Sequence, residues 1–183
     1  MVPVRISNAE SNSSCIVYGL LDSGADRDVI SEKLVKRLGL PTRNTILKVV
    51  TVGNEITSER ELADFTIESI DSDYGAEIED ALVGDILTSE NDIPPYQRDL
   101  SNFHHLKDIK FPRISAEIAI IIGAAHTSAW TPTEVRRGKK DEIIACNSAF
   151  GWYISGRMGK GQSDAITLNA IATDNIVLKE ELD

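Results

Sequence analysis

The chain has little cysteine, few aromatic residues and no apolar run long enough to cross a membrane. Two of its 183 residues are cysteine, and aromatic residues make up 5%. Two cysteines cannot form a disulfide framework, so we expect Cys15 and Cys146 to be buried thiols in a reducing compartment. Neither an apolar segment of about 20 residues nor a signal peptide is evident. These absences predict a cytoplasmic protein with no membrane partner.

Basic residues are also fewer than acidic residues. Lysine and arginine total 19 against 29 acidic residues, a net charge of −10, which predicts no direct contact with nucleic acid. The basic cluster at residues 136–140 is expected to lie in a solvated loop spanning residues 131–141, with contact to an acidic substrate segment as the alternative. His104, His105 and His126 lack partners at metal-ligand spacing, so we expect neither a metal nor another cofactor.

The most informative segment is DSGADRDVI at residues 22–30, which follows the apolar run CIVYGLL. An aspartate that ends an apolar strand before Ser-Gly is the active-site loop pattern of aspartic peptidases. Asp22 would be held rigidly by the strand, Ser23 is small and can fix the loop by hydrogen bonding, and Gly24 permits a tight turn that brings an N–H to the carboxylate. A chance surface turn is the alternative, because all three residue types favour turns.

Two later segments support the first. IAIIIGAA at residues 118–125 predicts a fully buried strand behind the loop, ended by Gly123 where two backbones come close. An ordinary core strand that ends in a turn would look similar. The third segment is FGWYISG at residues 150–156.

Together these segments resemble the aspartic peptidases of Bel/Pao-type retrotransposons, a branch of the retropepsin-like group. The first motif is common to the whole group, whereas FGWYISG is narrower and favours this branch over a retropepsin-like host protease. The resemblance implies an endopeptidase that processes its own polyprotein in the cytoplasm, including within virus-like particles, and a chain excised from a longer one. The matching stretches, in order within roughly residues 14–157, are residues 20–41, 120–130 and 150–156.

A single Asp-Ser-Gly loop has a consequence for assembly. Two-lobed aspartic peptidases carry two such loops on a longer chain, but this sequence has one. Aspartic proteolysis would therefore take its second carboxylate from another copy, in a twofold homodimer with one Asp22 from each subunit. The rival hypothesis is a catalytically silent or domesticated module that keeps the fold for dimerisation or peptide binding.

The expected fold is mostly β: a retropepsin-like acid-protease barrel with one or two short helices, forming a single lobe of the homodimer. We place the peptidase domain at residues 14–157, after an N-terminal segment at residues 1–13. A long insert at about residues 88–113 is expected to contain a helical turn near Leu106. Residues 158–183 are expected to be a tail or linker.

Local patterns predict the individual elements. Ser31 is a helix N-cap, and Gly39 with Pro41 ends that helix. A hairpin with its turn at Gly53-Asn54 lies where the family has its flap, although a plain surface hairpin would have the same pattern. Strands are expected at residues 16–21, 46–52, 65–70, 78–83, 118–122, 142–147 and 152–155.

The resemblance also implies substrate-binding residues. Ala25 and Asp26 would meet the substrate backbone, and the flap tip would contribute Val52, Gly53 and Asn54. The alternative for Asp26 is a charge that caps the loop. In retroviral proteases an arginine after the strand-ending glycine pairs with this aspartate. Here Ala124 takes that position, so the brace is absent or comes from another residue, with Arg27 as a candidate.

Overall fold

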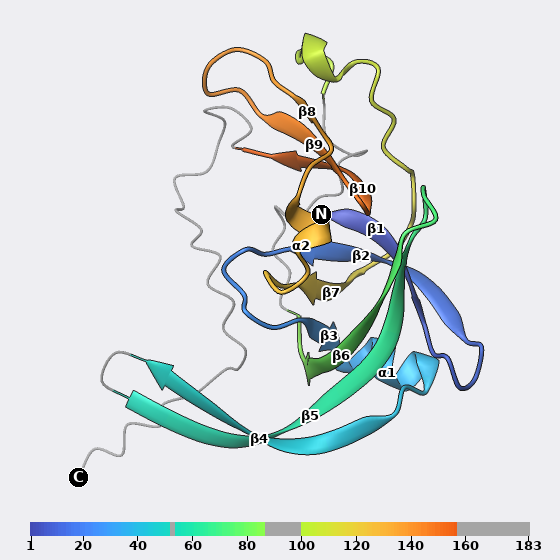
Figure 1. Ribbon diagram of the computed structural model, residues 1–183, viewed down its shortest axis with the longest axis vertical. Helices are drawn as coiled ribbons and strands as arrows, with labels where there is room; N and C mark the ends of the chain where they lie inside the picture. Colours follow the sequence, from blue (N-terminus) through green and yellow to red (C-terminus); the bar gives the residue numbers. More distant parts are fainter. Residues whose placement is uncertain (52–53, 87–99, 157–183) are drawn as a thin grey trace.

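The computed structural model describes residues 1–51, 54–86 and 100–156. For residues 48–51 and 54–56 it describes the backbone alone. It is mostly β, as expected, and its centre is a closed barrel (Figure 1). The order is β1-β2-β7-β3-β6-β5, and β5 pairs back onto β1. The barrel strands are β1 (Val2–Ser7), β2 (Ser14–Leu21), β3 (Val29–Ser31), β5 (Asn54–Ser69), β6 (Gly75–Gly84) and β7 (Ile118–Ile122).

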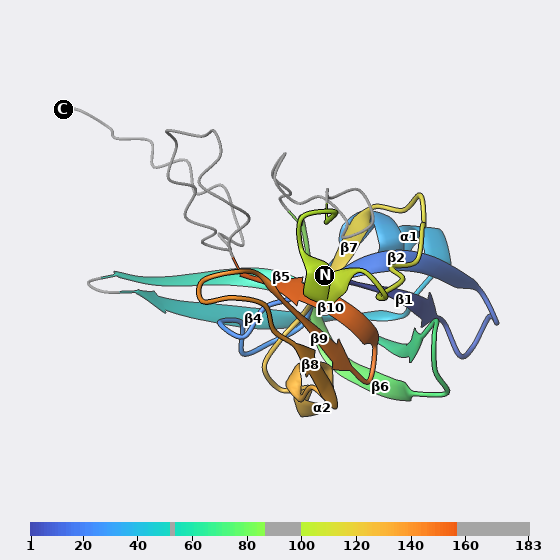
Figure 2. The same cartoon turned by 90° about the horizontal axis from the view of Figure 1, so that it is seen from above.

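Strand β4 (Thr42–Thr51) forms a long hairpin with β5. The two strands stay in register from Thr42 opposite Ala63 to Thr51 opposite Asn54. Figure 2 shows this hairpin, which we call the arm, extending well away from the barrel. The predicted hairpin is confirmed and is longer at its base than the pattern indicated. Val52 and Gly53, at its tip, lie outside the described residues.

The barrel core includes the N-terminal segment that we set apart from the domain. Val2, Val4 and Ile6 alternate along β1 and are fully buried, as are Ile120 and Ile122 of β7. Alternation along a strand sends every second side chain to one face, and both strands therefore present an apolar face to the barrel interior. Residues 1–13 thus supply one wall of the barrel.

The first helix, α1 (Glu32–Leu38), begins and ends as predicted. The Ser31 hydroxyl oxygen accepts a hydrogen bond from the Leu34 N–H at 3.2 Å. Gly39 ends the helix in the left-handed conformation, with φ 59°. The second helix, α2 (Thr127–Trp130), is a single turn after β7, and η2 (His104–Leu106) is the helical turn expected near Leu106. The expectation of one or two short helices is confirmed.

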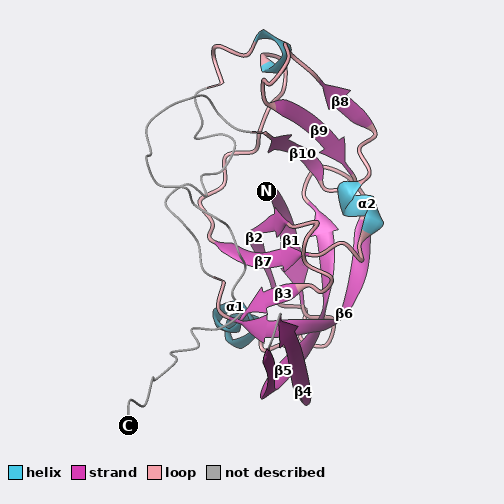
Figure 3. Ribbon diagram, turned by 90° about the vertical axis from the view of Figure 1, so that its left-hand side faces the viewer, coloured by secondary structure: helices cyan, strands magenta, loops and turns pink. Residues whose placement is uncertain are grey.

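A second, three-stranded sheet lies at one end of the barrel (Figure 3). Its order is β10-β9-β8, and β8 (Glu134–Arg136) corrects the prediction of a loop over residues 131–141. Three residues of sequence EVR show no strand pattern of their own, and β8 exists because it pairs with β9 (Ile144–Ser148). Strand β10 (Gly151–Ser155) completes the sheet.

The described part of the insert packs against this small sheet. Leu106 is buried with Ile143 and Ala145, and Phe103 packs against the same cluster. A ring nitrogen of His105, Nε2, lies 2.9 Å from the Ile143 carbonyl oxygen. Residues 100–109 therefore pack against the small sheet. Residues 87–99 of the insert lie outside the described residues, as does the expected tail.

Both cysteines are free thiols. Cys146 is buried as expected, but Cys15 is only half-buried, because it lies near the start of β2. The described part of the chain contains no helix that is both long and apolar enough to cross a bilayer.

Candidate active site

The Asp-Ser-Gly loop crosses the end of a buried strand. The loop leaves β2 at Asp22 and returns to β3 at Val29, and β7 lies between these two strands, parallel to β2 and antiparallel to β3 (Figure 1). The Asp22 N–H donates to the Ile122 carbonyl at 3.1 Å. Asp22 is therefore fixed at the junction of two barrel strands.

The loop turns back on the Asp22 carboxylate. The Gly24 N–H donates to Asp22 Oδ1 at 2.9 Å, as the motif predicted. The Ala25 N–H donates to the Asp22 carbonyl at 3.2 Å and closes the turn. Asp22 is half-buried, whereas Ser23 and Gly24 are exposed. The loop thus holds a carboxylate in a defined orientation where solvent reaches it.

Gly123 makes the close backbone approach that its sequence context predicted. A Cβ atom on Gly123 would lie 2.8 Å from the carbonyl oxygens of both Ala25 and Arg27, closer than real Cβ contacts. Next to it, the Ala124 N–H donates to the Ala25 carbonyl at 2.8 Å. The end of β7 is therefore packed directly against the backbone of the loop, and only glycine fits there.

The structure adds Asp28 and His126, which the sequence analysis did not assign to the site. Asp28 is 5% exposed. Its Oδ1 accepts the Gly123 N–H at 2.9 Å, and its Oδ2 lies 2.6 Å from His126 Nε2. One signal was present: an acidic residue directly before the apolar pair Val29-Ile30 lies at the start of a buried strand, where an unpaired charge is costly.

The residues expected at the retroviral brace position lie elsewhere. Asp26 and Ala124 are both exposed. Arg27 is also exposed and lines a hollow together with Leu47 and Leu62 of the arm. The side-chain contact between the loop and the segment after β7 is instead made by Asp28.

An apolar patch joins the loop to the base of the arm. The buried residues Val29, Leu82 and Ile121 form its floor. Half-buried side chains pack around this floor from the loop, from the arm, from β2 and from the residues after β6. We call the whole set the loop–arm patch; its half-buried members are Leu20, Ala25, Leu47, Leu62 and Ile86. Ala25 is therefore in contact with an apolar surface, whereas the side chain of Asn54, like all of Val52 and Gly53, is outside the described structure.

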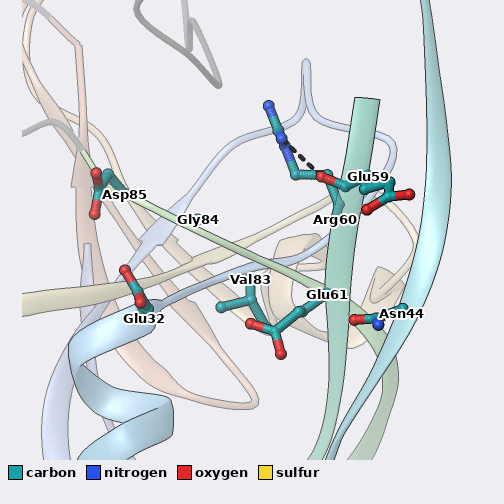
Figure 4. A pocket seen from close by; sticks show the side chains of 8 residues that line it. All are labelled: Glu32, Asn44, Glu59, Arg60, Glu61, Val83, Gly84 and Asp85. Carbon is teal, nitrogen blue, oxygen red and sulfur yellow. Dashed lines mark hydrogen bonds between the residues drawn. The ribbon is translucent and has the colours of Figure 1, made fainter. Parts of the chain in front are cut away.

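A second hollow is polar, and no residue of the Asp-Ser-Gly loop lines it. It opens between α1, the arm and the end of β6, and acidic side chains dominate its wall (Figure 4). Arg60 also lines it and donates to the Glu59 carbonyl at 2.8 Å. No group of three His, Cys, Asp or Glu side chains in the described residues is arranged to hold a metal ion. The residues that line this hollow are Glu32, Asn44, Glu59, Arg60, Glu61, Val83, Gly84 and Asp85.

The pKa values of Asp64 and Tyr153, both outside the loop, are displaced. The guanidinium of Arg43, which donates to Asp64 Oδ2 at 2.6 Å, lowers the pKa of Asp64 below its usual value. This pair lies at the base of the arm. In the small sheet, burial and the neighbouring Cys146 thiol raise the pKa of Tyr153 to about 12, so this phenol stays protonated at neutral pH.

Comparison of the chain with family models, with curated proteins and with solved structures gave no match. The fold and the loop define a class by themselves: a closed, mostly β barrel in which a buried strand backs an Asp-Ser-Gly loop.

Proposed function

We propose that the chain is a retropepsin-like aspartic endopeptidase of the Bel/Pao type, active as a homodimer that cleaves its own polyprotein. One observation carries this proposal: Asp22 is fixed at the end of β2 by the Ile122 carbonyl, and its carboxylate is oriented by the Gly24 N–H. The chain holds one such loop, so the second carboxylate would come from a second copy.

In the proposed dimer the two Asp22 carboxylates face each other and share one proton. Like charges about 3 Å apart cannot both ionise, so one pKa rises, the other falls, and the pair titrates as a unit. The ionised carboxylate takes a proton from a bound water, which attacks the scissile carbonyl. The protonated carboxylate polarises that carbonyl and then helps to protonate the leaving nitrogen. This chemistry requires neither a metal nor a covalent intermediate.

The apolar loop–arm patch favours a peptide as the substrate. It places an apolar surface between Ala25 and the arm residues Leu47 and Leu62. An apolar substrate side chain would bury against this surface. Asp26, exposed beside Ala25, would bind the substrate backbone, and the arm would act as the flap, with Val52, Gly53 and Asn54 at its tip.

The first test compares the purified chain with its Asp22→Asn twin. Each is incubated at high protein concentration and mildly acidic pH with the chain's flanking polyprotein, and fragments are identified by mass spectrometry. We expect discrete fragments from the wild type and a loss of at least about 1,000-fold in the twin, because the substitution removes the reacting group. Activity should follow a bell-shaped pH profile on the acid side, and a rate that climbs into the alkaline range would contradict the proposal.

A tandem fusion of two copies tests the shared dyad and removes weak dimerisation as an explanation for inactivity. Asp22→Asn in either copy alone should abolish cleavage as fully as the substitution in both. Full activity with one intact Asp22 would exclude a shared dyad. An inactive but folded tandem protein would favour the rival function, a dimerisation or peptide-binding module.

A further inference from the structure

The proposed chemistry leaves one buried acid unused. Among the residues that the structure describes as buried, Asp28 is the one carboxylic acid, with 5% of its surface exposed. A buried, unpaired carboxylate is expensive in free energy, so such a group is retained where its partners compensate. The partners of Asp28 therefore indicate what it does.

Asp28 is bonded through both carboxylate oxygens and through its backbone. Oδ1 accepts the Gly123 N–H at 2.9 Å, and Oδ2 lies 2.6 Å from His126 Nε2. The Asp28 carbonyl accepts the Leu82 N–H of β6 at 2.9 Å. These contacts join the end of the loop to β6, to the end of β7 and to the residue that precedes α2.

The same contacts determine where the end of β7 lies relative to Asp22. Gly123 is held on its other side, because Trp130 Nε1 donates to its carbonyl at 2.9 Å. The adjacent residue Ile122 accepts the Asp22 N–H, and Ala124 donates to Ala25. A displacement of Gly123 would therefore move both backbone contacts of the loop.

We propose that His126 is a positioning residue, which acts through Asp28 and Gly123 to hold the Asp22 loop in its reactive position. This inference rests on the proposed function. In the resemblance described above, a retroviral-type brace would come from the position of Ala124. In this chain a histidine two residues further along supplies the brace, and it reaches Asp28 instead of Asp26.

The hydrogen bond between Asp28 and His126 determines which substitutions of His126 test the proposal. Asp28 needs a donor at the position of His126 Nε2. Glutamine carries an amide nitrogen the same number of bonds from Cα as Nε2, so His126→Gln retains the donor. His126→Asn is too short, and His126→Phe keeps a ring without a donor. His105→Phe is the matched control, because that histidine also makes a hydrogen bond through Nε2, to the Ile143 carbonyl in the small sheet.

The kinetic test uses the full chain and its polyprotein substrate. A misplacement of about 1 Å costs up to about 100-fold in rate, so we expect His126→Phe and His126→Asn to lower kcat by about 10- to 100-fold. KM should change less than about twofold, because Leu47 and Leu62 on the arm side of the substrate surface are untouched. His126→Gln and His105→Phe should keep wild-type kcat. Wild-type kcat in His126→Phe would overturn the proposal.

Amide hydrogen exchange by NMR tests the positioning role without turnover. In His126→Phe, protection at Asp22, Gly123 and Ala124 should fall at least about tenfold, while the β1–β2 ladder around Ile6 stays protected. In the wild type, the imidazole Nε2–H should give a downfield, slowly exchanging proton signal that Asp28→Ala removes. Equal loss of protection in the ladder would show a general structural role and overturn the proposal. If the wild type does not cleave, the proposed function fails, and the exchange pattern still decides whether His126 holds the loop.

Discussion

Two hydrogen-bonded clusters of titratable side chains lie beside the proposed site, and their environments differ sharply. Asp28 and His126 meet beneath the loop, where the Asp28 side chain is 6% exposed. Arg43 meets Asp64 and Asp80 at the base of the arm, where the Arg43 and Asp64 side chains are 46% and 44% exposed. The first cluster is surrounded by protein and the second by solvent.

Burial decides what each cluster can do. A buried pair is costly to break, because the remaining partner cannot be solvated, whereas an exposed pair is screened and contributes little. The loop is thus held by contacts that tolerate little displacement, and the base of the arm by contacts that can break and re-form. The proposed function, in which the arm acts as a flap, requires a fixed carboxylate and an adjustable cover.

The largest effect is expected at the buried cluster. Asp28→Ala leaves the Gly123 N–H and His126 without their acceptor, and breaking a buried pair typically costs about 3–5 kcal/mol in the free energy of unfolding. Urea denaturation measures this cost. Asp64→Ala serves as the exposed control, and similar losses in the two variants would mean that burial does not separate the clusters.

Gly123→Ala tests how closely the backbone of the loop packs against the end of β7. Its added methyl would lie 2.8 Å from two loop carbonyl oxygens, and overpacking of this kind costs about 1–3 kcal/mol in the free energy of unfolding. We also expect cleavage to fall, because the loop itself must move. Gly84→Ala is the control, since its nearest atom, Val29 Cγ1, lies 3.8 Å away. Equal stability of the two variants would argue against close packing of the loop on β7.

A smaller effect is expected at the exposed cluster, with a defined pH dependence. The pKa of Asp64 is lowered by the Arg43 hydrogen bond. A lowered folded-state pKa stabilises the fold above the unfolded-state pKa, and this contribution is lost as pH falls through the folded-state value. Asp64→Asn should therefore cost less than about 1 kcal/mol at neutral pH.

The difference between wild type and Asp64→Asn should shrink as acid is added, over the range from about pH 5 to pH 1. Urea denaturation of both proteins across this range measures it. The Asn Oδ1 can still accept the Asp80 N–H, which donates to Asp64 Oδ1 at 2.8 Å in the wild type. The substitution thus removes the charge of Asp64 together with the acceptor for Arg43, and a difference that is constant with pH would exclude an electrostatic origin.

The features that the sequence predicted correctly are those set by short-range constraints. The Ser31 and Gly39 caps determine α1, and the turn that brings the Gly24 N–H to Asp22 lies within one loop. Gly123 was identified because a glycine that ends an apolar strand indicates close backbone approach. In each case neighbouring residues carry the relevant information.

The features that the sequence did not reveal depend on partners far along the chain. Strand β8 exists through pairing with β9, and its three residues carry no periodic pattern. Asp28 and His126 are separated by 98 positions, and the residues around each of them do not indicate that the two side chains meet. Strand β1 did show apolar alternation at Val2, Val4 and Ile6, but its place in the barrel follows from pairing with both β2 and β5.

The smallest effect is expected at Ile46, which tests how the arm differs from the loop. Ile46 is 71% exposed, whereas its neighbour Leu47, on the other face of β4, packs into the loop–arm patch. Ile46→Ser should change the free energy of unfolding by no more than about 0.5 kcal/mol, because little surface is buried there. Leu47→Ser should raise KM for the polyprotein, since it removes apolar surface beside Ala25. A rise in KM for Ile46→Ser alone would place the substrate on the opposite face of the arm and would separate the loop–arm patch from peptide binding.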